Sequence, residues 1–297
     1  MSRDLLAVST RDIAYPTALA AIHDPPPTLW VRGQADAIRT PSVAIVGSRA
    51  ASSYGLEVAR RLAAGLVRRG ITVVSGMARG VDSAAHHGAL DAGGATVAVF
   101  GCGADVVYPR EHAPLADRIC ERGAIVTEYP PGTPPLKYNF PKRNRIISGL
   151  SLAVVVVEAA EGSGSLITAD FALEQGRAVM AVPGNVLGGR NYGAHSLLRD
   201  GAKLVECADD ILEDLPVGIG DWGSGIGSRQ ESNNPNRASQ DPVLRRMTDG
   251  EAYDLDELSH MSGVDRVRLL PRLLELELSG AVRRVEGGRF VRFRGPC

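Results

Sequence analysis

A group of cations and aromatic rings lies in the stretch Lys137–Arg145, which reads KYNFPKRNR. It contains four cations and two aromatic residues, contains no acid, and runs straight into Ile146–Val157, which ends in a strongly apolar strand. Positive charges so close to a buried strand are costly unless an anion balances them. Single-stranded nucleic acid supplies such anions, together with flat bases that stack on rings. The stretch therefore predicts the mouth of a site for phosphates and bases.

Small residues follow nearly every apolar run, where a strand would end. Glycine lets a ligand approach backbone N–H groups, and a following helix offers its positive N-terminus to an anion. In the first of these turns Arg49 adds a planar guanidinium suited to phosphate, although a local pair with Glu57 is the alternative. The candidate nucleic-acid-binding residues are Gly47, Ser48, Arg49, Gly76, Arg79, Gly101, Lys137, Phe140, Lys142, Arg143, Asn144, Arg145, Gly162, Ser163, Gly164 and Ser165.

Several of these residues have a structural alternative. Phe140, more than Tyr138, could stack on a base, but it could equally be a core aromatic that closes the sheet. The run Arg143–Arg145 could be partly structural, with Asn144 capping the helix into Ser148. His86 and His87 have no cysteine or carboxylate at metal spacing, so we expect packing or surface roles and no metal site.

The surrounding chain alternates short apolar runs with helical patterns. Apolar runs begin near residues 43, 71, 95, 124, 152, 178 and 202, and helical patterns lie between them. This alternation is typical of βαβ units, and continuous apolar strands indicate a parallel sheet covered on both faces. We expect an α/β fold with a doubly wound, Rossmann-like domain over residues 42–215. Ligands bind such domains beyond the carboxyl ends of the strands.

Both ends of the chain differ from this pattern. Residues 1–41 are proline-rich and predict an N-terminal extension packed as a strap on the next domain. Residues 216–240 have the composition of a flexible linker. Residues 241–297 read as helix, helix and a hairpin with a Gly-Gly turn, which predicts a small winged-helix domain. Pro271 should kink or divide the second of these helices.

Composition and motifs exclude several classes. A net charge of −1 means that any anion site must be built locally. The longest apolar run is far shorter than the ~20 residues of a membrane span. The first turn is not G-x-G-x-x-G, the second strand ends in Ser75-Gly76 rather than an acid, and no P-loop occurs. We therefore expect no cofactor. The four cysteines lack CxxC spacing, which suits a reducing compartment.

Six motifs in order carry a resemblance to a known family: VAIVGSR (43–49), SGMARGVDSAAH (75–86), GCGADVVYP (101–109), FPKRNRIISGLS (140–151), GSGSLIT (162–168) and AVPG (181–184). Together they resemble the DNA-processing protein A family (DprA/Smf), from about Tyr15 to Leu215, and the tail resembles that family's winged-helix domain more weakly. The resemblance implies a non-catalytic cytoplasmic protein that binds single-stranded DNA. It also implies a homodimer formed through the Rossmann domain, and loading of the RecA recombinase in natural transformation.

The sequence departs from the family pattern in two places. Many relatives carry a helical domain ahead of the Rossmann unit, and residues 1–14 are too few for one. Gly193-Ala194-His195 stands where relatives commonly show Gly-Thr-Asn, which leaves the role of His195 open.

Two other functions remain open. Rossmann-like nucleotide phosphoribohydrolases pair a GGxGT turn with a glutamate one helical turn later, but Ala169 or Asp170 lies near that place here. General acid–base catalysis is therefore poorly supported. The second alternative is a transcription regulator that binds DNA through its winged helix. Basic residues of the wing favour it, whereas the even charge balance of the tail opposes it.

Overall fold

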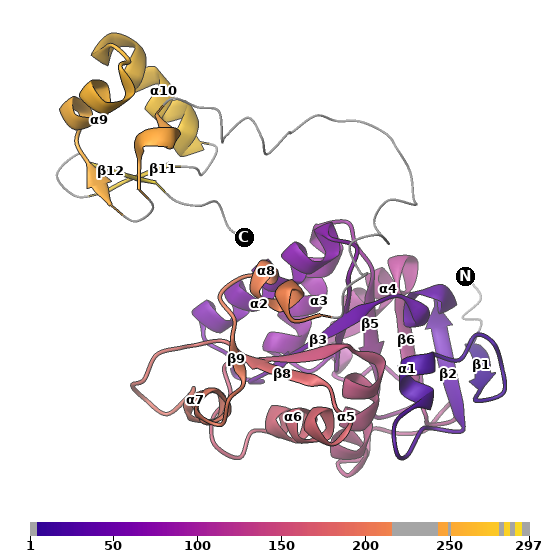
Figure 1. Ribbon diagram of the computed structural model, residues 1–297. Coiled ribbons are helices and arrows are strands. Elements are labelled where there is room, and N and C mark those ends of the chain that lie inside the picture. Colours follow the sequence, from indigo (N-terminus) through magenta and orange to yellow (C-terminus); the bar gives the residue numbers. More distant parts are fainter. Residues whose placement is uncertain (1–4, 216–242, 249–250, 279–281, 286–288, 293–297) are drawn as a thin grey trace. The chain divides into compact units, whose positions relative to one another are not determined.

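The computed structural model describes residues 5–215, 243–248, 251–278, 282–285 and 289–292 (Figure 1). The chain forms two compact units, Met1–Gly225 and Ile226–Cys297. The linker expected over residues 216–240 lies outside the described residues. Within the described part of the chain, no helix combines the length and apolarity needed to cross a membrane.

The first unit is built on one sheet, in which residues 5–215 contribute nine strands in the order β1-β2-β6-β5-β4-β3-β7-β8-β9. The seven neighbouring strands β6-β5-β4-β3-β7-β8-β9 all run parallel to one another. In chain order the strands are β1 Leu5–Ser9, β2 Thr28–Gly33, β3 Ser42–Gly47, β4 Thr72–Ser75, β5 Thr96–Val99, β6 Ala124–Thr127, β7 Ala153–Val157, β8 Ala178–Ala181 and β9 Lys203–Leu204.

Helices cover both faces of this sheet (Figure 1). They are α1 Thr17–Ala20, α2 Ser53–Arg68, α3 Val81–Asp91, α4 Ala113–Arg122, α5 Asn139–Leu150, α6 Gly164–Glu174, α7 Tyr192–Arg199 and α8 Ala208–Glu213. Apolar residues of α1, α5, α6 and α7 pack on one face, and those of α2, α3 and α8 pack on the other. Because both faces are covered, every residue of β4 and β7 is buried. The expected doubly wound α/β fold is confirmed.

Helix α5 is the crossover between the two halves of the sheet. It follows β6, passes β5, β4 and β3, with all of which it is in contact, and leads into β7. Its inner side buries Ile146 and Ile147. The crossover therefore places the predicted basic stretch close to the carboxyl ends of several strands.

The N-terminal extension joins the sheet rather than lying across it as a strap. Strand β2 pairs antiparallel with β6, with Trp30 opposite Thr127, and β1 pairs antiparallel with β2. Leu19 and Leu29 are fully buried in the same core as α5. The extension thus supplies β2, which lies inside the main sheet between β6 and the edge strand β1.

The second unit contains α9 Leu255–Ser262, α10 Arg266–Leu278 and a sheet of β10 Ala252–Tyr253, β11 Val282–Arg284 and β12 Phe290–Arg292, in the order β10-β12-β11. Its core includes Leu258, Leu273 and Phe290. Two helices against a small antiparallel sheet confirm the winged helix. Pro271 lies inside α10, which continues past it undivided. The predicted Gly-Gly turn lies outside the described residues.

Candidate nucleic-acid interface

The strand order reverses between β3 and β7, and a cleft of about 480 Å³ opens there at their carboxyl ends. Such a reversal is the usual ligand site of a doubly wound sheet. Turns after both strands line the cleft, and α5 closes one side of it. Of the predicted residues, the cleft brings together Gly47, Ser48, Arg49, Phe140, Arg143, Asn144, Gly162, Ser163, Gly164 and Ser165.

The two turns are held together by backbone contacts. Ser48 N donates to the carbonyl oxygen of Glu158 over 2.8 Å. A Cβ atom on Gly47 would lie 1.8 Å from the carbonyl oxygen of Val157, so no other residue fits at this position. The glycine therefore allows two backbones, rather than a ligand and a backbone, to approach each other.

Arg49 stands exposed at the edge of the cleft. Its Cζ lies 6.0 Å from the centroid of the Phe140 ring, within the range of a cation–π contact. Glu57, the acid that could have paired with it, is bonded to Arg61 at 2.7 Å. The guanidinium of Arg49 is thus presented to solvent beside an aromatic face.

Phe140 is half-buried and forms part of an aromatic ledge with Tyr108. The two ring centroids lie 5.4 Å apart with the planes tilted by 40°. Tyr108 is 46 % exposed, so this ring is also open to a base. A Cβ on Gly101 would lie 3.0 Å from Phe140 Cδ1, so this buried glycine makes room for the ring. Tyr108 escaped the sequence analysis, although it lies in the motif 101–109.

Arg79 lies on the far side of the ledge. Together with Arg49, Tyr108 and Phe140 it lines a small recess next to the cleft. Arg79 Nε donates to Glu111 Oε1 over 2.6 Å, and both side chains are exposed. An exposed pair of this kind is weak, so Arg79 could exchange its carboxylate for a phosphate at little cost.

Arg143 lies under the cleft, in a group that we call the cleft floor: Arg143, Asp82 and Gly76. Arg143 is only 4 % exposed and donates to the carbonyl oxygens of Gly76, over 2.9 Å, and of Val99. Asp82 is buried beside it and accepts from the backbone N–H groups of Gly76 and Ala78. A Cβ on Gly76 would lie 2.7 Å from Asp82 Oδ2 and 2.8 Å from Arg143 Nη2.

Burial is the largest cause of the shifted pKa values of the two charged residues in the cleft floor. It lowers the pKa of Arg143 to about 10, against the opposing attraction of Asp82. Burial also raises the pKa of Asp82, and the charge of Arg143 opposes that rise. The two groups stabilise each other in their charged forms and brace the carboxyl ends of β4 and β5. The structure thus engages Arg143, at the bottom of the cleft, in internal contacts.

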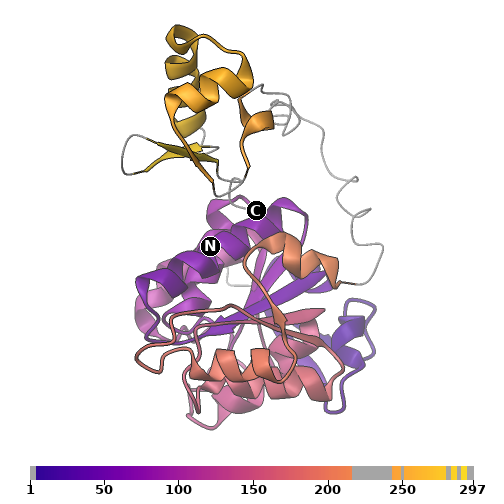
Figure 2. The same ribbon diagram turned by 60° about the vertical axis from the view of Figure 1, so that its left-hand side comes forward.

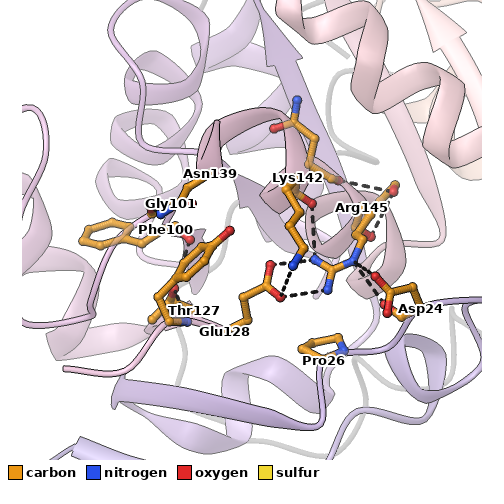
Figure 3. Close-up of polar contacts among 12 residues, drawn as sticks. Asp24, Pro26, Phe100, Gly101, Thr127, Glu128, Asn139, Lys142 and Arg145 are labelled. Carbon is orange, nitrogen blue, oxygen red and sulfur yellow. Dashed lines mark hydrogen bonds and ion pairs between the residues drawn. The ribbon is translucent and has the colours of Figure 1, made fainter. Parts of the chain in front are cut away.

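Arg145 lies outside the cleft lining and joins three distant segments (Figure 3). Its two terminal nitrogens bond the carboxylate of Glu128 at 2.8 and 2.9 Å, and its Nε bonds Asp24 Oδ2 at 3.1 Å. Such bidentate, charge-assisted bonds are the strongest that arginine makes. This Arg145 clasp ties the N-terminal segment and the end of β6 to α5.

Two lysines of the predicted stretch face outward. Lys142 is 56 % exposed, and its Nζ lies 3.8 Å from Glu128 Oε2, the same carboxylate that Arg145 grips (Figure 3). Lys137 and the ring of Tyr138 are exposed just before α5. These side chains remain available to a ligand, unlike the two arginines between Lys142 and Ile146.

Asn144 does not cap a helix, which corrects the alternative raised from sequence. Helix α5 already begins at Asn139, with Pro141 in its first turn, where proline is tolerated. Asn144 therefore lies in the helix interior. Its Nδ2 donates to the carbonyl oxygen of Gly164 over 3.1 Å, which fixes the start of α6 against α5.

The N-terminus of α6 points at the cleft. Ser163 is its N-cap, and its Oγ lies 2.8 Å from Ser165 Oγ. Gly162 has a φ of +72°, and a Cβ on Gly162 or Gly164 would meet nothing within 4 Å. The space over this turn is therefore open, and the positive end of the helix dipole faces it.

The histidines have structural surroundings. His86 is buried with its Nδ1 2.7 Å from Thr96 Oγ1. Thr96 donates its own proton to the carbonyl oxygen of Val73, so His86 Nδ1 must be the donor. Burial lowers the pKa of His86 to about 3. His195, whose role was open, places Nε2 3.3 Å from Gly184 N and 3.2 Å from Gly184 O, beside the turn after β8.

Comparison with known proteins identifies relatives of both units of the chain. The family model for DNA recombination-mediator protein A matches residues 7–216, and that for the DprA winged helix domain matches residues 228–288. Protein Smf of Escherichia coli K12 is 43% identical over 289 residues, which cover 95% of this chain and 76% of that protein. DNA processing protein DprA of Streptococcus pneumoniae R6 is 46% identical over 207 residues, 70% of this chain and 73% of that protein.

Solved structures give the same result. The X-ray structure of DNA processing protein A from Streptococcus pneumoniae has a TM-score of 0.69 at 44% identity, covering 72% of this chain and 75% of that one. DNA processing protein A from Helicobacter pylori has a TM-score of 0.64 at 29% identity, covering 73% of this chain and 100% of that one. The chain therefore belongs to the DprA/Smf family.

Proposed function

We propose that the protein binds single-stranded DNA across the cleft at the switch point of its sheet. One observation carries the proposal: exposed Arg49, an aromatic ledge and the N-terminus of α6 meet at one cleft. The Helicobacter pylori relative is described in terms of its single-stranded DNA binding mode, which supports the same function here.

The arrangement assigns separate tasks to the side chains. Arg49, Lys137 and Lys142 contact phosphates, and the backbone at Gly162–Ser165 receives a further phosphate at the helix N-terminus. A base stacks on the ledge of Phe140 and Tyr108. Since every base has a π-face and every nucleotide a phosphate, binding of this kind does not depend on sequence. Arg143, Asn144 and Arg145 hold these groups in place from below.

The lining of the cleft favours binding over hydrolysis of a small nucleotide. Asp82, one of its acids, already accepts two backbone hydrogen bonds and lies against Arg143. Glu161 is exposed at the edge, and Asp170, the position suggested for a general acid, does not line the cleft. A general acid or base needs a free carboxyl within reach of the reacting bond, and neither Asp82 nor Asp170 meets that condition.

Family membership supports the further steps of the proposal. We propose that the protein, in the cytoplasm and as a homodimer formed through its first unit, loads RecA onto the bound strand during natural transformation. Added RecA should then acquire ATPase activity sooner on strands coated with a single-strand-binding protein. Arg49→Ala should remove that acceleration, and a rate of RecA activation equal with and without the protein would contradict the loading step.

The binding step is tested by fluorescence anisotropy with oligo-dT and with a duplex of equal length. We expect tighter binding of oligo-dT, with affinity falling by about 0.7 log unit per neutralised phosphate for each tenfold rise in salt. Arg49→Ala should weaken binding and lower that slope by about one contact. Arg122→Ala is the matched control. This exposed arginine contacts Gly93 O and lies just before β6, at the amino ends of the strands and so away from the cleft. Equal affinities of wild type and Arg49→Ala would exclude Arg49 from the site.

A further inference from the structure

A second pocket, of about 730 Å³, opens on the other side of the turn that carries Arg49. Its lining includes Ser52, Tyr54, Glu158, Pro183, Leu187 and Arg190. The turn 47–52 separates the two hollows: Gly47 to Ala50 line the cleft, and Ser52 lines the pocket. Both therefore lie along the same carboxyl edge of the sheet.

Arg190 stands on the boundary between them. Its Nη1 donates to the carbonyl oxygen of Ala50 over 2.8 Å and lies 3.9 Å from Glu158 Oε1. The side chain is nevertheless 62 % exposed. A guanidinium has five N–H donors in a fixed fork. One contact to Ala50 thus fixes its direction and leaves donors for a phosphate on the solvent side.

Tyr54 supplies a flat surface inside the pocket. The ring is 51 % exposed, yet its hydroxyl donates to the carbonyl oxygen of Pro183 over 2.9 Å. Leu187 adds an exposed apolar side chain from the loop after β8. That loop is braced, because Asn191 Nδ2 donates to the carbonyl oxygen of Asn185 and Asn185 Oδ1 accepts from Leu187 N. An oriented ring beside an apolar side chain suits a stacked base.

Glu158, an acid in the pocket lining, decides which part of a nucleotide can lie inside the pocket. Glu158 is buried and holds the backbone N–H of Ser52 at 2.9 Å as well as its hydroxyl. Its negative charge opposes a phosphate inside the pocket. A nucleotide therefore fits with its base inside, against Tyr54, and its phosphate outside, at Arg190.

We propose that this pocket is a second nucleotide subsite, which holds the same DNA strand after it passes over Arg49 and Ala50. The proposal rests on the proposed function, since the strand must first occupy the cleft. Arg190 binds the phosphate and Tyr54 stacks on the base. The strand then follows the edge of the sheet from the aromatic ledge across the turn after β3 to the loop after β8.

The test compares oligo-dT of two lengths, about 5 and about 20 nucleotides, on the full chain. Arg190→Ala should weaken binding of the longer strand by roughly 5- to 10-fold at about 0.05 M salt and lower its salt slope by about 0.7. Binding of the short strand should not change. Arg190→Lys should keep most of the slope because the charge remains. Arg199→Ala, an exposed arginine at the other end of α7, is the matched control.

Each result distinguishes the subsite from the cleft. If Arg190→Ala binds the long strand like wild type while Arg49→Ala does not, the subsite is refuted and the proposed function stands. If Arg190→Ala weakens both lengths equally, Arg190 only positions the turn at Ala50, and a separate subsite is again refuted. If Arg49→Ala has no effect on either length, the proposed function fails first. Tyr54→Ala should repeat the length dependence of Arg190→Ala without altering the slope.

Discussion

The cleft floor and the cleft rim use cations in opposite ways. The floor, formed by Arg143, Asp82 and Gly76, is buried and its hydrogen bonds end within the protein. The rim, by which we mean Arg49, Lys137 and Lys142, is exposed. Arg49 lines the cleft, whereas the two lysines lie just before α5 and in its first turns, outside the cleft lining. A buried charge is retained only where partners offset its desolvation, whereas an exposed charge is free to exchange water for phosphate. Position in the fold, rather than charge, thus separates the cations that support the sheet from those that stay exposed.

The largest loss of stability should follow from removing the Arg143 side chain from the cleft floor. Arg143→Ala leaves Asp82 buried without its counter-charge, and we expect the free energy of unfolding of the first unit to fall by roughly 3–5 kcal/mol. Urea denaturation followed by circular dichroism measures this. Asp82→Asn together with Arg143→Ala should cost less than the sum of the two single changes. A loss below about 1 kcal/mol for Arg143→Ala would show that the floor is no more structural than the rim.

Acid should destabilise the interior near the floor through His86. Its folded pKa is about 3 and its ordinary value 6.5, so below the ordinary value the unfolded chain takes up a proton that the folded protein refuses. Stability present at neutral pH is lost as pH falls. We expect the free energy of unfolding to fall by about 3 kcal/mol because of His86 as the pH is lowered from about 6.5 to about 4. Denaturation of wild type and His86→Gln across this range tests it. If the free energy of unfolding fell equally with pH in both proteins, the predicted role of His86 would be contradicted.

Adding one methyl group should disturb the floor less than removing a charge. In Gly76→Ala the new Cβ would meet Asp82 Oδ2 and Arg143 Nη2 at under 3 Å. We expect a loss of about 1–3 kcal/mol from overpacking, measured by urea denaturation. Gly164→Ala is the control, because its Cβ would meet nothing within 4 Å. Equal stabilities of the two variants would show that the floor has room to spare.

The smallest effect on stability should come from the rim. Lys142→Ala removes an exposed side chain whose contact with Glu128 is long, so the free energy of unfolding should change by less than about 0.5 kcal/mol. Its salt slope for oligo-dT should nevertheless fall by up to about 0.7. Anisotropy titration against salt measures this. A large loss of stability with an unchanged slope would place Lys142 with the floor.

The sequence predicts the framework of this fold well. Strands such as β3 and β7 are buried on both faces, so their residues are continuously apolar, and the helices between them keep a regular apolar stripe. The turns at their ends follow from the same pattern. The chain alone therefore predicts that ligands bind at the carboxyl ends of the strands, but not the strand order that makes the turns after β3 and β7 face each other.

The division between floor and rim could not be predicted in the same way. Lys142, Arg143 and Arg145 are neighbours in the chain and equally cationic. On α5 they point in different directions, and only the long-range partners Asp82, Glu128 and Asp24 decide which of them is buried. Tyr108 escaped notice for a similar reason, since only its position beside Phe140 makes it part of the ledge.

The crossover helix α5 has a consequence for synthesis on the ribosome. A nascent chain that has emerged as far as Leu150 already contains β3 to β6, but it still lacks β7 and α6. The turn after β3 then has no opposite wall, and Asn144 has no Gly164 to hold. The cleft should thus form only once the residues that supply β7 and α6, up to about Glu174, leave the exit tunnel, rather than growing with chain length.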